Sequence, residues 1–157
     1  MVVHVVAVGR VRDAALRAAC EDYLRRARRG LKIRVAEVPD AGRRAPTPAA
    51  ARRLEAMRLD AAVPPGAYTV ALTRTGRPLS SDAFARLLGQ WREGARDVAV
   101  LLGGAFGLDD RLLAAADLQL SLSPLTLPHD LARLLVLEQI YRAGTILRGE
   151  PYHKGRG

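Results

Sequence analysis

Cysteine, lysine and aromatic residues are scarce in this chain of 157 residues. Its single cysteine, Cys20, excludes a disulfide framework and a cysteine-based zinc cluster, and it is compatible with a reducing compartment. No apolar run approaches the roughly 18–20 residues that a membrane-spanning helix needs. The first residues are apolar, but no basic segment precedes them and Gly9 and Arg10 interrupt them, so the sequence predicts no signal peptide.

Several fingerprints of nucleotide binding and catalysis are also absent. The chain has neither a GxGxxG motif nor a phosphate loop with its Lys-Ser/Thr pair. Its three histidines, His4, His129 and His153, lack the spacing of zinc ligands, and no Ser-His-Asp or paired-carboxylate pattern stands out. The sequence therefore predicts no metal site, and a catalytic site must be sought by its position in the fold.

The composition is that of a globular protein. Hydrophobic residues make up 49% of the chain and charged residues 26%, which argues against global disorder. The length suits one domain of about 100–200 residues, and no linker or internal repeat divides it. We therefore expect a single domain over residues 1–157.

Positive charge is in excess and unevenly distributed. Lys and Arg number 25 against 16 Asp and Glu, and residues 1–60 carry a net charge of +7 out of the total +9. All but two of the basic residues are Arg, which suits bidentate contacts with phosphate. A nucleic acid or another polyanion is thus the expected partner, and a solvated basic surface is the alternative.

Strand and helix patterns alternate along the chain. Short apolar or alternating segments predict strands at residues 2–8, 31–35, 67–73, 97–102 and 118–122. Helical periodicity predicts helices at about 14–28, 48–62, from Ser80 or Ser81 through Trp91, at about 109–117 and at about 129–147. The predicted caps of the first three are Asp13, Thr47, and either Ser80 or Ser81. A turn is expected at 75–78. This alternation predicts an α/β fold with a mostly parallel sheet flanked by helices.

Three loops follow the carboxyl ends of predicted strands, where ligands bind in open α/β sheets. They follow Leu72, span the glycine-rich segment 103–107, and span 122–128. Glycines let a ligand approach the backbone, although a tight turn explains them equally well. Leu125 and Leu127 give the third loop an apolar character, so it either packs in the core or covers a flat apolar group such as an adenine ring.

The polar candidates lie near the carboxyl end of the chain. His129 begins a predicted helix and could act as a base, contact phosphate or only cap the helix. Arg133 follows one turn later, and Arg142 is placed to pair with Glu138 four residues before it. His153 lies in a polar tail of the kind that is often disordered, whereas His4 lies in a core strand and is interpreted as structural.

Short segments in the same order along almost the whole chain resemble the bacterial RlmH (YbeA-like) family of SPOUT methyltransferases. The most specific are Leu125-Thr126-Leu127-Pro128-His129 and Pro151-Tyr152-His153. The other matching segments are Val6-Ala7-Val8-Gly9, Tyr23-Leu24-Arg25-Arg26, Arg96-Asp97-Val98, Leu102-Gly103-Gly104, Gly107-Leu108, Leu120-Ser121-Leu122-Ser123 and Tyr141-Arg142-Ala143.

The resemblance implies an S-adenosylmethionine-dependent enzyme that methylates N3 of a pseudouridine in 23S rRNA of the assembled ribosome. It also implies a cytoplasmic homodimer with a carboxyl-terminal trefoil knot, and neither a metal nor a membrane. Carried over by position, the cofactor-binding residues are Leu72, Gly103, Gly104, Leu122, Ser123, Pro124, Leu125, Thr126 and Leu127. The residues near the substrate are His129, Arg142, Tyr152 and His153.

The resemblance suggests roles for these residues and one departure. His129 and His153 are candidate bases for the N3 proton, because a histidine pKa lies near neutrality, and Arg142 could stabilise charge on a neighbouring carbonyl oxygen. Ala105 and Phe106 stand where some relatives have a Pro-Glu pair, which removes a carboxylate from the glycine turn. A non-catalytic ribosome-binding protein with a degenerate pocket is therefore one alternative. A nucleotide-binding α/β enzyme that acts on a small molecule is another.

Overall fold

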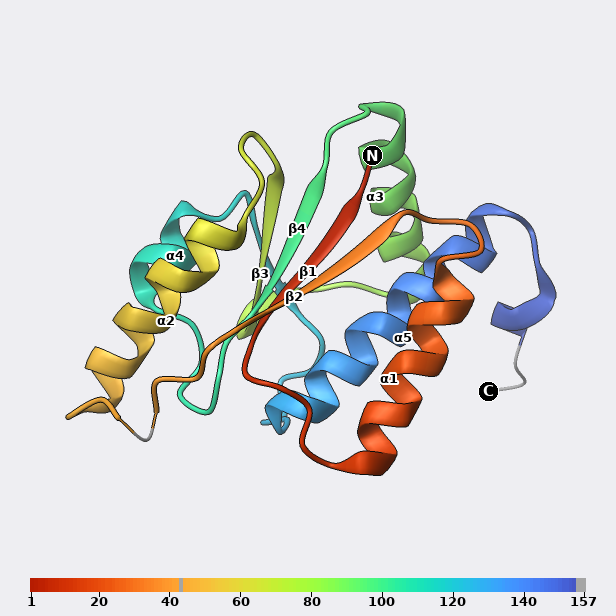
Figure 1. The fold of residues 1–157 in the computed structure, drawn as a ribbon. Helices are drawn as coiled ribbons and strands as arrows, with labels where there is room; N and C mark the ends of the chain where they lie inside the picture. The colour runs from red at the N-terminus through yellow and green to blue at the C-terminus, as the bar shows by residue number, and fades with distance from the viewer. Residues whose placement is uncertain (43, 155–157) are drawn as a thin grey trace.

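The computed structural model describes residues 1–42 and 44–154, except for the side chains of His153 and Lys154. Within this part of the chain, five strands alternate with five α-helices, and a 3-10 helix follows (Figure 1). In chain order the elements are β1 (Val3–Val8), α1 (Ala14–Ala27), β2 (Ile33–Val38), α2 (Pro48–Ala62), β3 (Tyr68–Pro78), α3 (Ser81–Glu93), β4 (Val98–Leu102), α4 (Asp110–Ala115), β5 (Leu118–Ser121), α5 (His129–Leu147) and η1 (Pro151–Lys154).

Capping side chains begin most of the helices. The predicted caps Asp13 and Thr47 each accept a hydrogen bond from the backbone N–H three residues later, at 2.8 and 3.1 Å. Of the two serines considered, Ser80 is the cap, because its Oγ accepts from the N–H of Ala83 at 3.2 Å. These bonds satisfy backbone donors that the first turn of a helix leaves free, and so they fix where each helix starts.

The five strands form one parallel sheet in the order β2-β1-β4-β3-β5. The predicted α/β fold with a mostly parallel sheet flanked by helices is confirmed. The chain crosses over the sheet by a helix after each of the first four strands, as parallel pairing requires. All carboxyl ends of the strands therefore lie at the same edge.

Helices cover both faces of the sheet. α1, α3 and α5 lie on one side, and α2 and α4 lie on the other (Figure 1). Successive side chains of β1 alternate between the two layers: Val5 belongs to the larger core under α1, α3 and α5, and Val6 belongs to the smaller core under α2. Burial on both faces explains why the inner strands are continuous apolar runs.

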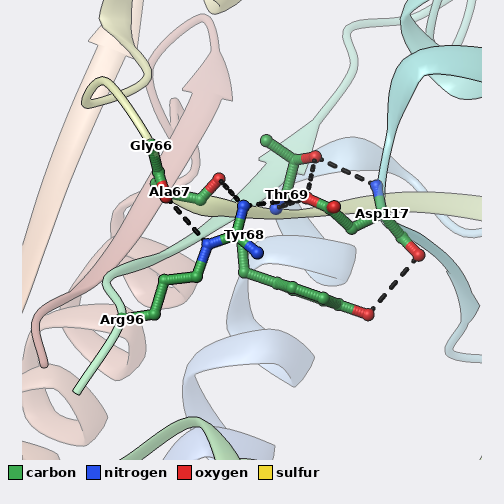
Figure 2. Close-up of polar contacts among 6 residues, drawn as sticks. All are labelled: Gly66, Ala67, Tyr68, Thr69, Arg96 and Asp117. Atoms are coloured by element: carbon green, nitrogen blue, oxygen red, sulfur yellow. Dashed lines mark hydrogen bonds and ion pairs between the residues drawn. The ribbon is translucent and has the colours of Figure 1, made fainter. Parts of the chain in front are cut away.

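Polar contacts close the amino-terminal edge of the sheet (Figure 2). The Asp117 carboxylate accepts hydrogen bonds from the backbone N–H and the hydroxyl of Thr69, at 2.8 and 3.0 Å, and this N–H lowers the pKa of Asp117. Arg96 Nε donates to the carbonyl of Gly66 at 2.8 Å. Nearby, His4 contacts Asp97 at 3.4 Å, which agrees with its structural interpretation. The polar side chains at this edge of the sheet are thus bonded to other groups of the same edge.

One local expectation is wrong: residues 75–78 do not form a turn. β3 runs on to Pro78, and it pairs with β5 both before and after a shift of register, so that Leu72 and Arg77 both lie opposite Leu120. Residues 73–76 have no paired partner in β5 between these two points. A Cβ on Gly76 would lie 2.7 Å from the backbone of Leu120, so this close pairing needs glycine.

α5 packs along α1 and α3, and the chain after it folds back onto α5 (Figure 1). The tail, which composition alone placed among segments that are often disordered, forms η1 with Tyr152 against Tyr141. In the part of the chain that the structure describes, we find no helix with the length and apolarity to cross a bilayer.

Candidate functional site

A cavity of about 570 Å³ opens at the carboxyl-terminal edge of the sheet. Its lining comes mainly from residues 72–75 of β3, the glycine turn after β4 and the loop between β5 and α5. These are the three loops that the sheet-edge rule selects. The volume lies in the range of about 300–1,000 Å³ that is typical of small-molecule sites.

The glycine turn is tight and also forms part of the cavity lining. The N–H of Gly107 donates to the carbonyl of Gly104 at 3.1 Å, which closes the turn. A Cβ on Gly103 would lie 2.5 Å from the carbonyl carbon of Gly107, so no other residue fits there. These glycines therefore form a tight turn and also line the cavity.

The cavity gathers eight of the nine residues that the resemblance assigns to cofactor binding. Leu72 comes from β3, Gly103 and Gly104 from the glycine turn, and the others from the loop before α5. The eight lining residues are Leu72, Gly103, Gly104, Leu122, Ser123, Leu125, Thr126 and Leu127, whereas Pro124 is exposed and does not line the cavity.

Leu125 decides between the two interpretations of the 122–128 loop. Its exposed fraction is 72%, so it does not pack in the core of this chain. The loop is held by the Ser123 hydroxyl, which accepts from the N–H of Leu125 at 3.0 Å, and by Arg74, which donates to the Thr126 hydroxyl at 3.2 Å. An apolar side chain is thus presented at the cavity and is available to cover a flat apolar group.

His129 lines the same cavity from the first residue of α5. Its side chain is 40% exposed, and its Nε2 lies 3.1 Å from Asp130 Oδ1. The helix has no side-chain cap, so His129 does not serve as one. An accessible imidazole beside a carboxylate can accept a proton and hold the resulting positive charge.

Arg142 and Tyr152 lie together, but far from His129. Arg142 forms an ion pair with Glu138 at 2.7 Å and stacks over the Tyr152 ring, 4.9 Å from its centroid. At about 1.5 Å per residue along α5, this cluster is about 20 Å from His129. One copy of the chain therefore does not bring these three side chains to one place.

The neighbours of Arg142 and Tyr152 determine the protonation of both side chains. Tyr152 also donates to Glu138 at 3.2 Å and contacts the Tyr23 hydroxyl at 3.3 Å. Burial and these neighbours hold the pKa of Tyr152 far above its usual value, so it is a hydrogen-bond donor and not a base near neutral pH. The hydrogen bond with Glu138 raises the pKa of Arg142, which keeps its charge. The His153 side chain lies outside the described residues.

Arg52, Arg74 and Phe106 line the cavity as well, and sequence reasoning did not select them. Arg74 follows the end of the predicted third strand, so the sheet-edge rule could have found it. Arg52 lies in the first turns of α2, where only proximity in the fold brings it to the cavity. Phe106 occupies the position noted as a departure from the family pattern.

The buried carboxyl group of Glu55 lies against the glycine turn. Glu55 is only 2% exposed, its Oε1 accepts from the N–H of Ala41 at 2.9 Å, and a Cβ on Gly104 would lie 3.1 Å from its Oε2. Burial raises the pKa of Glu55, and Asp40 raises it further. The hydrogen bond from the N–H of Gly42 instead lowers the pKa of Asp40. In the described ranges, no group of three or more metal-ligating side chains comes together.

Comparison with solved structures gives the class of fold. A structure described as a probable methylase family protein from Haemophilus influenzae Rd KW20 matches with a TM-score of 0.57 over 96% of this chain and 69% of that chain. The sequences are 12% identical, so the likeness concerns the fold alone. The molecule thus shares the α/β fold of that structure and has a cavity at the carboxyl-terminal edge of its sheet.

The family follows from the sequence over nearly the whole chain. A family model described as "Predicted SPOUT methyltransferase" matches residues 1–153, and the chain belongs to this family. Proteins named Ribosomal RNA large subunit methyltransferase H are similar to it. The one from Anaeromyxobacter sp. (strain Fw109-5) is 47% identical over 98% of this chain and 100% of its own. The one from Bordetella petrii is 43% identical over 96% and 97%.

Proposed function

We propose that this protein is an rRNA methyltransferase that acts on N3 of a pseudouridine in 23S rRNA of the assembled, cytoplasmic ribosome. The observation that carries the proposal is the single cavity that gathers Leu72, the glycine turn and the loop before α5. Family membership and the names of relatives that match over the full chain support the same activity. A degenerate, non-catalytic pocket is not favoured, because relatives named as methyltransferases match over nearly the full chain and the cavity has the volume of a small-molecule site.

The residues present fit S-adenosylmethionine. Backbone groups of Gly103, Gly104 and the 122–127 loop would hold its adenine and ribose, and the exposed Leu125 would cover the adenine. Bound there, the cofactor would supply the methyl group of its sulfonium, and S-adenosylhomocysteine would be the leaving group. The protein's part is to place the acceptor nitrogen in line at about 3–3.5 Å and to exclude water.

His129 is the proposed acceptor of the N3 proton. It lines the cavity, is accessible and lies beside Asp130, whose charge would stabilise the imidazolium. As N3 loses its proton, a neighbouring carbonyl oxygen of the pseudouridine gains negative charge. The positive charge of Arg142 would stabilise this oxygen, and the Tyr152 hydroxyl would donate a hydrogen bond to it. His153 is an alternative proton acceptor from the same end of the chain.

Arg142 and Tyr152 can act on the same base as His129 only if two copies of the chain meet. The separation of about 20 Å along α5 supports a homodimer in which one copy supplies the cavity with His129 and the other supplies Arg142 and Tyr152. The excess of Arg over acidic residues in the amino-terminal half favours a partner rich in phosphates, as rRNA is.

The test is transfer of a labelled methyl group. Purified protein is incubated with radiolabelled S-adenosylmethionine and ribosomes that lack the modification, beside free 23S rRNA, and the label is mapped. Label on a large-subunit pseudouridine establishes the activity, and the comparison of ribosome with free rRNA identifies the substrate form. Ribosomes that already carry the modification are the matched control and should take up no label. Absence of label from both substrates would contradict the proposal.

A further inference from the structure

Phe106 differs from every other aromatic residue of the chain. All seven aromatic residues lie within the described ranges, and six of them pack against one another. The pairs are Tyr23–Tyr141, Tyr141–Tyr152, Tyr68–Trp91 and Phe84–Trp91. Phe106 has no aromatic neighbour and is 39% exposed. Among the described residues, Phe106 is thus the exposed aromatic ring, and it lies in the lining of the cavity.

The ring lies at the cavity on the side of the basic segment that precedes α2. A Cβ on Gly42 would lie 3.3 Å from Phe106 Cε2, so the edge of the ring rests on the backbone of Gly42. Leu125, the other exposed apolar side chain at the cavity, belongs to the loop that Arg74 ties to β3. The two apolar side chains are thus anchored to different parts of the fold.

Two arginine side chains line the same cavity as the Phe106 ring. Arg52 and Arg74 line the cavity, and within the described part of the chain neither has an ion-pair partner, whereas Asp110 is the carboxylate of that lining. The Nε of Arg52 is buried and makes no hydrogen bond there. A buried guanidinium donor without an acceptor has a desolvation cost that an anionic ligand would offset.

An exposed aromatic ring beside arginines is the combination with which proteins bind unstacked bases of RNA. The ring stacks on a base, and the guanidinium contacts the neighbouring phosphate. The cofactor also contains a nucleobase, but Leu125 and the 122–127 loop already provide an apolar cover for it. The ring of Phe106 is thus free for a second base.

We propose that Phe106 stacks on a nucleobase of the RNA substrate at the mouth of the cavity, and that Arg52 contacts the adjoining phosphate. This inference rests on the proposed rRNA methyltransferase activity and names how the substrate is held. Phe106 and Arg52 act on substrate affinity and not on the transferred methyl group. Loss of the ring should therefore change the KM for ribosomes and leave the affinity for the cofactor unchanged.

The experiment compares four variants by two measurements: the KM for ribosomes that lack the modification, and the Kd for S-adenosylhomocysteine by calorimetry. Phe106→Leu keeps an apolar side chain without a ring, and Phe106→Tyr keeps the ring. Leu125→Ala removes the proposed adenine cover, and Met57→Ala is the control, because Met57 is 71% exposed on α2 and does not line the cavity.

Phe106→Leu should raise the KM for ribosomes about 10-fold, as expected for a lost base–aromatic stack, with the Kd for S-adenosylhomocysteine within about twofold. Phe106→Tyr and Met57→Ala should behave like the parent protein, and Leu125→Ala should weaken only S-adenosylhomocysteine. If Phe106→Leu weakens S-adenosylhomocysteine instead, the ring packs on the cofactor and the inference is overturned. Unchanged KM and Kd overturn it too. If the parent protein methylates no rRNA, it is the proposed function that fails.

Discussion

Arg133 reaches the Glu37 carboxylate from α5, with 2.5 Å between its Nη1 and Glu37 Oε1. The Arg133 side chain is only 4% exposed, and its Nη2 also donates to the carbonyls of Val8 and Gly9, at 3.2 and 2.8 Å. A single buried guanidinium thus joins α5 to the carboxyl ends of β1 and β2, beside the turn that carries His129.

Removal of that guanidinium should destabilise the protein strongly. Arg133→Gln leaves two backbone carbonyls without donors, and we expect the free energy of unfolding to fall by about 2–4 kcal/mol. Arg10→Gln is the matched control, because Arg10 Nε lies 3.7 Å from Oε2 of the same Glu37 but the Arg10 side chain is 89% exposed. Its loss should lower the free energy of unfolding by less than about 1 kcal/mol. Urea titrations measure both, and equal losses would contradict this account.

Glu55 makes stability depend on pH. Its pKa in the folded protein lies above the ordinary 4.5, so the folded state binds the proton more tightly than the unfolded state. The stabilisation is complete below the ordinary pKa and is lost as pH rises through the raised value. Asp40, whose pKa is lowered, acts in the opposite sense and only at lower pH.

Glu55→Gln should therefore flatten the pH dependence of unfolding between pH 5 and pH 8. Glutamine keeps an oxygen acceptor for the N–H of Ala41 and cannot ionise. Denaturant titrations at both pH values, on the variant and the parent protein, measure the difference. Parallel losses of stability in the two proteins would show that Glu55 does not titrate in this range.

Two inactive variants should restore activity when they are mixed, if copies of the chain share sites. His129→Ala and Arg142→Ala should each lower the single-turnover rate by about 100-fold or more. In a mixed dimer, one of the two sites receives both native side chains, so an equimolar mixture refolded together should recover about a quarter of the parent activity. Each variant refolded alone is the control. No recovery would contradict a site that is shared between two copies.

Salt should weaken ribosome binding through only some of the arginines between residues 25 and 34. Arg25 and Arg26 both pair with Asp22, whereas Arg29 and Arg34 are exposed and, in the described residues, have no ion-pair partner. Arg29→Gln should reduce the slope of log affinity against log salt by about 0.7–0.9 if that side chain meets a phosphate. Arg92→Gln on α3 is the control, and an unchanged slope for Arg29→Gln would exclude that contact.

Much of the fold was predictable because its signals are local. The caps Asp13, Thr47 and Ser80 and the bounds of α5 are confirmed, since capping and helical periodicity depend on neighbouring residues. The order of the strands is set by packing between distant segments and could not be deduced. The failed turn at 75–78 has the same cause: Gly76 and Pro78 resemble a turn locally, but pairing with β5 keeps the segment in the sheet.

The loops of the candidate site that follow strands were predictable from the sequence. The side chains that α2 contributes to the site were not. Leu72, Gly103 and the 122–127 loop follow strands, so the parallel topology brings them together. Glu55 and Arg52 lie within a helix, where nothing in the sequence distinguishes them from a solvated face. The knot and the dimer that the resemblance implies stay predictions.

The shift of register in β3 has a consequence for how a ligand enters and leaves. Residues 73–76 are attached to β5 on both sides, through Leu72 and through Arg77, so this wall of the cavity cannot swing like a flap. The 122–127 loop has no such double anchorage: Pro124, Leu125 and Thr126 are exposed, and one hydrogen bond from Arg74 joins Thr126 to β3. We therefore expect residues 73–76 to keep their position when a ligand binds. We expect the 122–127 loop to open when the product leaves.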